Sequence, residues 1–158
     1  MWNTTVHQKI TSKRSLVYHT WITFSETMFG FLLGTSLGIL LAITIVHNRA
    51  TAISVMPWII TSQTIPILAL APMIVVALGS AGFSGLLPIA IISMYLSFFP
   101  VVVGMVKGLR SPESLELDQM KTWSASGPQV LMKLRLPKSM PFFFTSLKLG
   151  MAAALVGA

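Results

Sequence analysis

The sequence predicts an all-α integral membrane protein with about four membrane-spanning helices and one charged loop outside the membrane. Two observations predict this class. Of the 158 residues, 54% are hydrophobic and only 9% are charged, against roughly 25% charged residues in an ordinary soluble domain. The chain also has two long stretches without Lys, Arg, Asp or Glu. A soluble fold with so few charges would expose apolar patches far larger than a monomer tolerates, so lipid is the expected solvent.

The composition also excludes several classes of function. The net charge of +7 comes from basic residues that lie in the gaps between apolar runs, which is not the pattern of a nucleic-acid site. The chain has no cysteine, and His7, His19 and His47 are scattered, so no metal site is predicted. The sequence offers no catalytic constellation and no Walker-type loop. We therefore expect no enzyme activity and no cofactor in this chain, with any ATP bound by a partner subunit.

The first expected span covers about residues 22–46 and follows a polar N-terminal segment, residues 1–20, without a signal peptide. Residues 27 to 46 carry no charge and are long enough to cross the hydrocarbon layer. Gly30, Gly34 and Gly38 recur every four residues, so one face of this helix has no side chains. This pattern favours close helix packing, although glycine is also common in membrane helices generally.

Residues 50 to 106 form the second uncharged stretch. As one helix it would be roughly 85 Å long, so it must turn back once. The glycine-dense run at 79–85 is the expected turn, which gives spans over about residues 52–78 and 86–106.

The span over 52–78 is expected to be kinked or interrupted by Pro57, Pro66 and Pro72, because each proline removes a backbone donor. Broken helices at membrane depth line a cavity or a packed interface. Gln63 and Thr64 are among the few polar side chains there. The stretch is therefore either part of the pore wall or a kinked packing helix.

The last third of the chain changes in character. Residues 107–138 hold six of the eleven basic residues and three of the four acidic ones, so they form an aqueous loop, expected as two short helices divided near Ser124 to Pro128. A last span follows at about residues 141–158 and contains Lys148. The sequence stops inside this apolar segment, so we expect it to be a fragment.

The distribution of positive charge predicts the orientation. With four spans, residues 1–20 and 79–85 share one side of the membrane with three basic residues, and residues 47–51 and 107–138 share the other with seven. The positive-inside rule then makes the first side extracytoplasmic and the loop at 107–138 cytoplasmic.

At this point the sequence resembles a family, the inner-membrane permeases of ABC importers, in particular the nitrate, sulfonate and taurine group. These proteins carry a loop patterned Glu-Ala-Ala, three residues, Gly, nine residues, Ile-x-Leu-Pro. The same spacing here runs through Asp118-Gln119-Met120, Ser124 and Leu134-Arg135-Leu136-Pro137. Asp118 keeps the acidic residue of the pattern, but Ser124 stands where the pattern has glycine. The turn is made at the glycine position of the pattern unless Gly127 makes it instead. The proline-rich run at 64–72, residues 108–112 and Leu147-Lys148 are also similar to this group.

The resemblance implies a permease domain over residues 21–158, about six helices in the intact protein and a location in the bacterial inner membrane. It implies three partners. One is a second permease chain, either an identical copy in a homodimer or a paired subunit. The other two are a cytoplasmic ABC ATPase and an extracytoplasmic substrate-binding protein. The loop would be the ATPase-coupling site, with these residues: Asp118, Lys121, Trp123, Ser124, Ala125, Ser126, Gly127, Leu134, Leu136 and Pro137.

Several alternatives remain open from the sequence. The chain is either an importer permease or a subunit of another multi-span secondary transporter or channel. The charged loop either docks a partner or lies on the membrane surface with Trp123 at the headgroups. Lys148 either faces the pathway or snorkels to an interface. The pathway candidates are Gln63, Thr64, Pro66, Pro72 and Lys148, and the transported solute is not specified by the sequence.

Overall fold

The computed structural model describes residues 16–62, 64, 67–83 and 86–157. Every regular element among them is a helix. In chain order they are α2 (Leu16–His47), α3 (Arg49–Ser62), α4 (Ile67–Ser80), α5 (Leu86–Leu109), α6 (Ser114–Thr122), α7 (Gly127–Val130), the π-helical turn η1 (Leu131–Arg135) and α8 (Leu136–Gly157).

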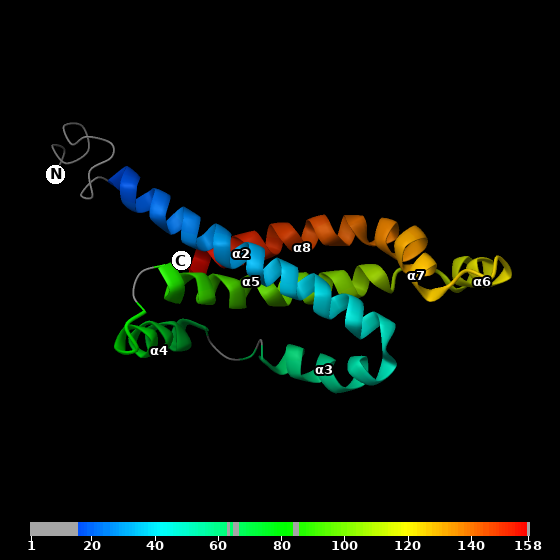
Figure 1. Cartoon of the computed structure of the whole chain (residues 1–158), viewed down its shortest axis with the longest axis horizontal. Helices are drawn as coiled ribbons and strands as arrows, with labels where there is room; N and C mark the ends of the chain where they lie inside the picture. The colour runs from blue at the N-terminus through cyan, green and yellow to red at the C-terminus, as the bar shows by residue number, and fades with distance from the viewer. Residues whose placement is uncertain (1–15, 63, 65–66, 84–85, 158) are drawn as a thin grey trace.

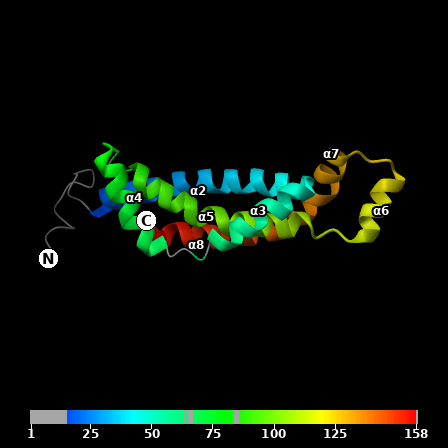
Figure 2. The ribbon, with the colours of Figure 1, turned by 90° about the horizontal axis from the view of Figure 1, so that it is seen from below.

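Three long helices form the body of the molecule. The central helix is α5, which contacts α2 on one side and α8 on the other much more extensively than these two contact each other (Figure 1, Figure 2). Its middle and last turns supply most of the apolar core, in which Val101, Val102 and Leu109 are fully buried. Ala42 and Ile45 of α2 complete this core.

Within the described residues, three segments are long and apolar enough to cross a membrane: 18–47, 86–109 and 127–157. They correspond to the first, third and fourth spans that the sequence predicts. The first helix begins at Leu16, inside the segment predicted as polar and extracytoplasmic, while residues 1–15 of that segment lie outside the described residues. An α-helix can continue beyond the hydrocarbon layer because its backbone hydrogen bonds are satisfied internally.

The predicted span at 52–78 is two helices rather than one. Helices α3 and α4 have 14 residues each, roughly 21 Å, so neither alone covers the hydrocarbon thickness. They follow one another along the three-helix body, from the end where α2 stops to the end where α5 starts (Figure 1). Pro57 and Pro72 lie inside them, and the break falls between residues 62 and 67, next to Pro66. Gln63 and Pro66 themselves lie outside the described residues.

The last helix starts earlier than expected. The sequence places the span from about residue 141, whereas α8 begins at Leu136 and carries Pro141 within its second turn. The π-helical turn η1 lies directly before it, with a backbone bond from the N–H of Leu136 to the oxygen of Leu131. A proline ring clashes with the carbonyl four residues earlier in a regular α-helix. We attribute the π-helical turn to Pro137, because the wider turn accommodates the proline ring and lets the helix continue into α8.

Candidate functional site

The charged loop at 107–138 projects beyond one end of the three-helix body, as Figure 2 shows for α6 and α7. Helix α6 begins with a capping box, in which Glu113 caps the first turn and the Glu116 carboxylate accepts from the Glu113 backbone N–H at 2.9 Å. Ser126 and Gln129 form a second capping box at the start of α7. Two local signals in the sequence therefore start the two short helices of this loop.

The turn between these helices is made by Ser124. Its φ of +51° places it in the left-handed region that favours glycine. The N–H groups of Ser124 and Ala125 donate to the oxygens of Lys121 at 2.8 Å and Met120 at 3.0 Å, which is the glycine-type ending of an α-helix known as the Schellman motif. Ser124 is the position where the family pattern has glycine. Gly127 instead starts α7 and has no positive φ.

Replacing Ser124 with glycine is therefore expected to stabilise α6 by about 1 kcal/mol, because glycine lacks the Cβ that disfavours this conformation. Hydrogen exchange of the α6 amides measures the effect. The matched control is Ser126→Gly, since Ser126 has a φ of −68° and caps α7. A Ser124→Gly variant with faster α6 exchange than the parent would contradict the assignment.

Two contacts hold the loop against the membrane helices. The Glu116 carboxylate of α6 pairs with the Lys138 ammonium at the start of α8. Arg135 donates from Nη1 to the carbonyl oxygen of Leu109 at 3.2 Å, at the end of α5. The hydrogen bond from Lys138, followed by the one from the Glu113 backbone, holds the pKa of Glu116 below its ordinary value of 4.5.

The sign of this shift predicts how α6 responds to acid. A carboxyl group whose pKa is lower in the folded state contributes stability above its unfolded pKa and loses it as the pH falls through the folded value. We expect hydrogen-exchange protection factors of α6 to be constant from neutral pH down to about the ordinary pKa and to fall below it. Glu116→Gln should remove this dependence, whereas Asp118→Asn should keep it, because Asp118 pairs only with Lys121 in an exposed bridge. Equal acid sensitivity in the Glu116→Gln protein would refute the role of this pair.

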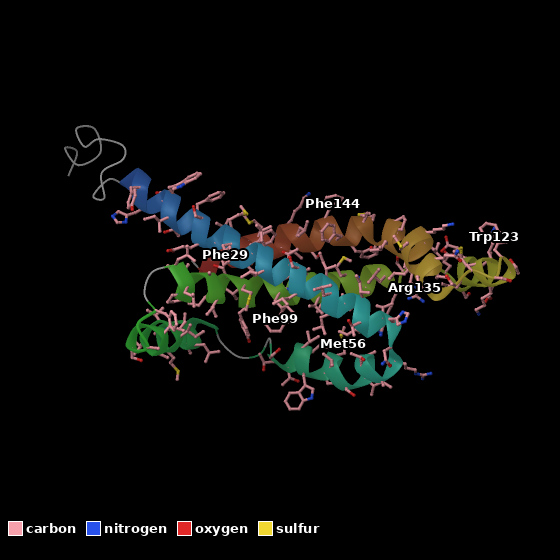
Figure 3. The ribbon with its side chains drawn as sticks, in the orientation of Figure 1. Phe29, Met56, Phe99, Trp123, Arg135 and Phe144 are labelled. Carbon is pink, nitrogen blue, oxygen red and sulfur yellow. The ribbon has the colours of Figure 1, made fainter. Side chains whose placement is uncertain are left out.

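One face of α6 points away from the rest of the protein. Leu115 is 76% exposed and Trp123 is 68% exposed, and Gln119 lies between them at the same helical spacing. About 100° around the helix lie Met120, which is buried, and Glu116, which is half-buried. A short helix with an exposed Leu and Trp is a typical anchor for a partner protein. Figure 3 shows Trp123 at the far end of the projecting helices.

The remaining residues predicted for this site lie along the same loop. Asp118, Lys121, Ser126, Gly127 and Pro137 are exposed; the others, Ala125, Leu134 and Leu136, are half-buried. The structure thus collects the whole predicted set in one projecting segment, from α6 to the first turn of α8 (Figure 1).

The glycine face of α2 lies against α5. A Cβ placed at Gly30 would overlap the Ala90 carbonyl oxygen and come within 2.8 Å of the Ser93 Cβ. A Cβ at Gly34 would overlap the Ser97 hydroxyl and come within 2.5 Å of the Met94 oxygen. At Gly38 the nearest atom, Val101 Cγ1, would be 3.0 Å away. The two backbones therefore approach more closely than any residue with a side chain would permit.

A second small-residue interface joins α5 to α8, and the sequence interpretation missed it. Gly104 lies against Ser146, and Gly108 lies against Ser139 and Phe142, where an added Cβ would be only 2.9 Å from the Ser139 Cβ. Both serines are buried. The four-residue spacing of Gly104 and Gly108 is the same signal that singles out the glycines of α2, and it could have predicted this interface.

Among the described residues, the pathway candidates lie on separate segments of the chain. Thr64 is exposed just after α3, where its hydroxyl donates to the Thr61 oxygen at 2.7 Å. Pro72 is exposed on α4 and Lys148 is exposed on α8. Within the described residues Lys148 has no carboxylate partner, and Glu26, which is buried in α2, has no basic partner.

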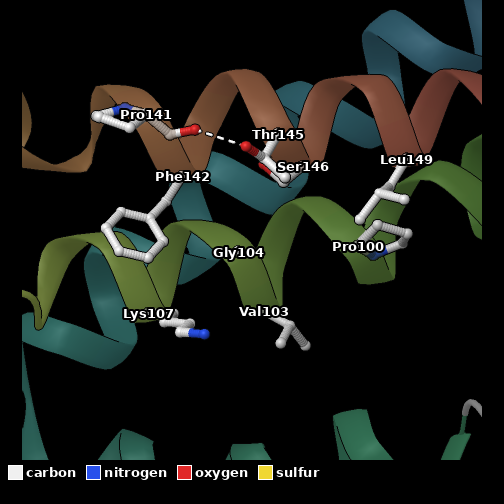
Figure 4. Close-up of a pocket in the computed structure, with 9 residues that line it drawn as sticks. All are labelled: Pro100, Val103, Gly104, Lys107, Pro141, Phe142, Thr145, Ser146 and Leu149. Carbon is white, nitrogen blue, oxygen red and sulfur yellow. Dashed lines mark hydrogen bonds between the residues drawn. The ribbon is translucent and has the colours of Figure 1, made fainter.

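A groove lies between α5 and α8, and none of these candidates lines it. It encloses about 510 Å³ and is lined by small, apolar and hydroxyl side chains, with the Lys107 ammonium 5.9 Å from the centre of the Phe142 ring at one end (Figure 4). Thr145 in its wall donates to the Pro141 carbonyl oxygen, one turn earlier, at 2.9 Å, so this hydroxyl is satisfied within α8.

Comparison with known proteins shows the family of the chain. Residues 34–158 match the family described as binding-protein-dependent transport system inner membrane component. The chain is 31% identical over 154 residues to a protein of Haemophilus influenzae named probable ABC transporter permease, covering 97% of this chain and 61% of that protein. It is 32% identical over 136 residues to the formylaminopyrimidine transport permease ThiX of Halalkalibacterium halodurans, covering 86% of this chain and 53% of ThiX.

A third relative is the riboflavin transport system permease RibX of Chloroflexus aurantiacus, 28% identical over 140 residues, with 89% of this chain and 51% of RibX covered. The chain thus spans about three fifths of the first relative and about half of the other two. The family match includes the glycine face from Gly34, the interrupted helix, the projecting loop and α8. The chain therefore belongs to the family of binding-protein-dependent transport system inner membrane components, and it is an all-α protein of the inner membrane.

Proposed function

We propose that this chain is part of the permease subunit of an ATP-binding-cassette importer, with the loop at 107–138 as its contact with a separate cytoplasmic ATPase. The observation that carries the proposal is the form of this loop. It projects as a short helix with an exposed Leu and Trp, and it turns at Ser124, where the family pattern has glycine. A stand-alone channel or secondary transporter does not need a projecting helix with exposed apolar side chains that can bind a partner protein.

The attachments of the loop support a mechanical role. Because Glu116 is paired to Lys138, a push on α6 would reach α8 directly, and the bond from Arg135 of η1 to the Leu109 oxygen would pass it on to α5. Helices that move as rigid bodies transmit domain closure in this way. ATP binding and hydrolysis by the partner would thus be coupled to rearrangement of the membrane helices.

The orientation follows from the position of the charges. The α2–α3 corner and the charged loop lie at the same end of the body, and the turn between α4 and α5 lies at the other (Figure 1). The first end is proposed to be cytoplasmic, since it carries seven basic residues. An external binding protein would then deliver solute at the opposite end, and a second permease chain would complete the pathway.

The proposed solute is a small polar or heterocyclic molecule, of the kind named for the relatives ThiX and RibX. The interrupted helix from α3 to α4, including Thr64 and Pro72, remains the proposed pathway wall. Backbone groups without helical hydrogen bonds are tolerated at membrane depth only where they line a water-filled cavity or are buried against protein. Lys148 would face this pathway or extend to an interface.

Reconstituted uptake tests this function. Vesicles containing the whole permease, its ATPase and its binding protein should accumulate a solute from a panel containing formylaminopyrimidine and riboflavin, and only with hydrolysable ATP. An ATPase variant that binds but does not hydrolyse ATP is the control. Uptake by the permease alone, driven by an ion gradient, would instead support a secondary transporter.

A further inference from the structure

A cavity of about 410 Å³ lies where the α2–α3 corner meets the end of α5 and the base of the charged loop. A second cavity of about 300 Å³ adjoins it and shares His47, Leu117 and Arg135 in its wall. Figure 3 shows Arg135 at this junction between the three-helix body and the projecting helices. The cavity is therefore lined by residues of five elements, α2, α3, α5, α6 and η1.

Its polar wall is entirely basic. His47, Arg49, Arg110 and Arg135 line it, and no Asp or Glu is among its lining residues. The ion pairs of the described residues join Lys121 to Asp118 and Lys138 to Glu116, which leaves Arg49 and Arg110 without a carboxylate partner. Like charges gathered around a cavity repel one another, so their arrangement is stabilised by an anion that binds between them.

The geometry restricts which anion fits. Arg135 is held in place by its bond to the Leu109 oxygen, so its other N–H groups are oriented before a ligand arrives. Arginine presents a planar fork of donors that matches the oxygens of a phosphate group. The lining also has an apolar part, which includes the almost fully buried Ile45 and Leu109.

We propose that this cavity is a binding site for a phosphate group, bridged by Arg49, Arg110 and Arg135. The phosphate comes either from the headgroup of an anionic phospholipid in the cytoplasmic leaflet or from soluble phosphate. The position at the ends of α2 and α5 and the apolar part of the lining fit a lipid, because basic pockets between membrane helices on this side bind anionic headgroups. The bound phosphate would join the starts of α3 and α8 to the end of α5 and so fix the charged loop on the membrane body.

The test compares two double variants of the whole permease in lipid nanodiscs. R49Q/R110Q removes two arginines of the cavity, and both are exposed, so folding should be retained. The matched control is K107Q/K133Q, which removes the same charge from exposed residues that do not line the cavity. Melting temperature and retained lipid, the latter by native mass spectrometry, are measured in phosphatidylcholine alone, with added phosphatidylglycerol, and with added inorganic phosphate.

We expect phosphatidylglycerol to raise the melting temperature of the parent and of K107Q/K133Q. R49Q/R110Q should melt no lower than the parent in phosphatidylcholine, because the repulsion between the arginines is relieved. It should bind the anionic lipid at least about tenfold more weakly, because each hydrogen bond to a charged group changes the affinity by on the order of tenfold. A shift with inorganic phosphate alone, lost in R49Q/R110Q, would assign the site to the soluble ion. Equal losses in both double variants, or no shift with either probe, would overturn the proposal. These readouts need neither ATPase nor uptake, so they are independent of the proposed function.

Discussion

A Gly34→Leu substitution is expected to separate α2 from α5 and to prevent assembly of the three-helix body. A side chain at this position meets the Ser97 hydroxyl and the Met94 carbonyl oxygen, at a close helix crossing where the Met94 backbone cannot yield as a flexible side chain does. Overpacking by a few methylene groups typically costs about 1–3 kcal/mol, and a leucine at a helix crossing should cost more. Melting temperature and gel filtration of the purified permease measure the loss.

Gly79→Leu is the matched control for this experiment. Gly79 lies near the end of α4, and a Cβ added there would have no heavy atom within 4 Å, so it tests the general effect of replacing a membrane-helix glycine by leucine. Gly38→Ala should be intermediate, because Val101 Cγ1 is a side-chain atom that can shift. If Gly34→Leu and Gly79→Leu proved equally stable, the glycines of α2 would have no role in packing.

The second large effect is expected from Leu115→Glu, which should reduce ATPase binding at least about tenfold while leaving the permease folded. Leu115 is exposed and lies in the first turn of α6, where a negative charge favours the helix. Any loss therefore arises in the complex, where the new carboxylate must be desolvated without a counter-charge at a cost of several kcal/mol before relaxation. Co-purification with the ATPase and stimulated ATP hydrolysis provide the measurement.

Ser114→Glu serves as the control, since it adds the same charge to the same turn about 100° around the helix. ATPase binding by this variant should remain close to that of the parent. If both variants lost binding equally, general charge repulsion rather than a docking face would account for the effect. Normal binding by Leu115→Glu would indicate that α6 lies on the membrane surface.

Features that depend on local chemistry were predictable from the sequence. The uncharged stretches predicted the long helices α2 and α5, and the proline-rich run at 64–72 predicted the break after α3, because missing backbone donors act wherever the helix lies. The run from Ser124 to Pro128 predicted the division of the charged loop into two helices, whose caps in the structure are Glu113 and Ser126. The start of α8 was misplaced because Pro137 and Pro141 normally end helices, and the π-helical turn that tolerates them has no clear sequence signature.

Apart from the helix contacts that glycine spacing indicates, features that depend on tertiary contact were not predictable. The spacing match left open whether Ser124 or Gly127 makes the turn, and only backbone geometry assigns it to Ser124. Arg49, Arg110 and Arg135 are far apart in the sequence, and they gather around one cavity because α2, α5 and η1 end at the same level. Lys148, singled out as a lone cation in a span, lies outside the groove between α5 and α8, where Lys107 lies instead.

Site-specific cross-linking tests the central claim most directly, because the chain contains no cysteine of its own. A single cysteine is introduced at Gln119, on the outward face of α6, or at Ser80, in the last turn of α4 at the opposite end of the body. In vesicles containing the ATPase, Gln119→Cys should give a permease–ATPase product whose yield changes with ATP, and Ser80→Cys should give none. A product from Ser80→Cys, or its absence from Gln119→Cys at full ATPase occupancy, would contradict the account.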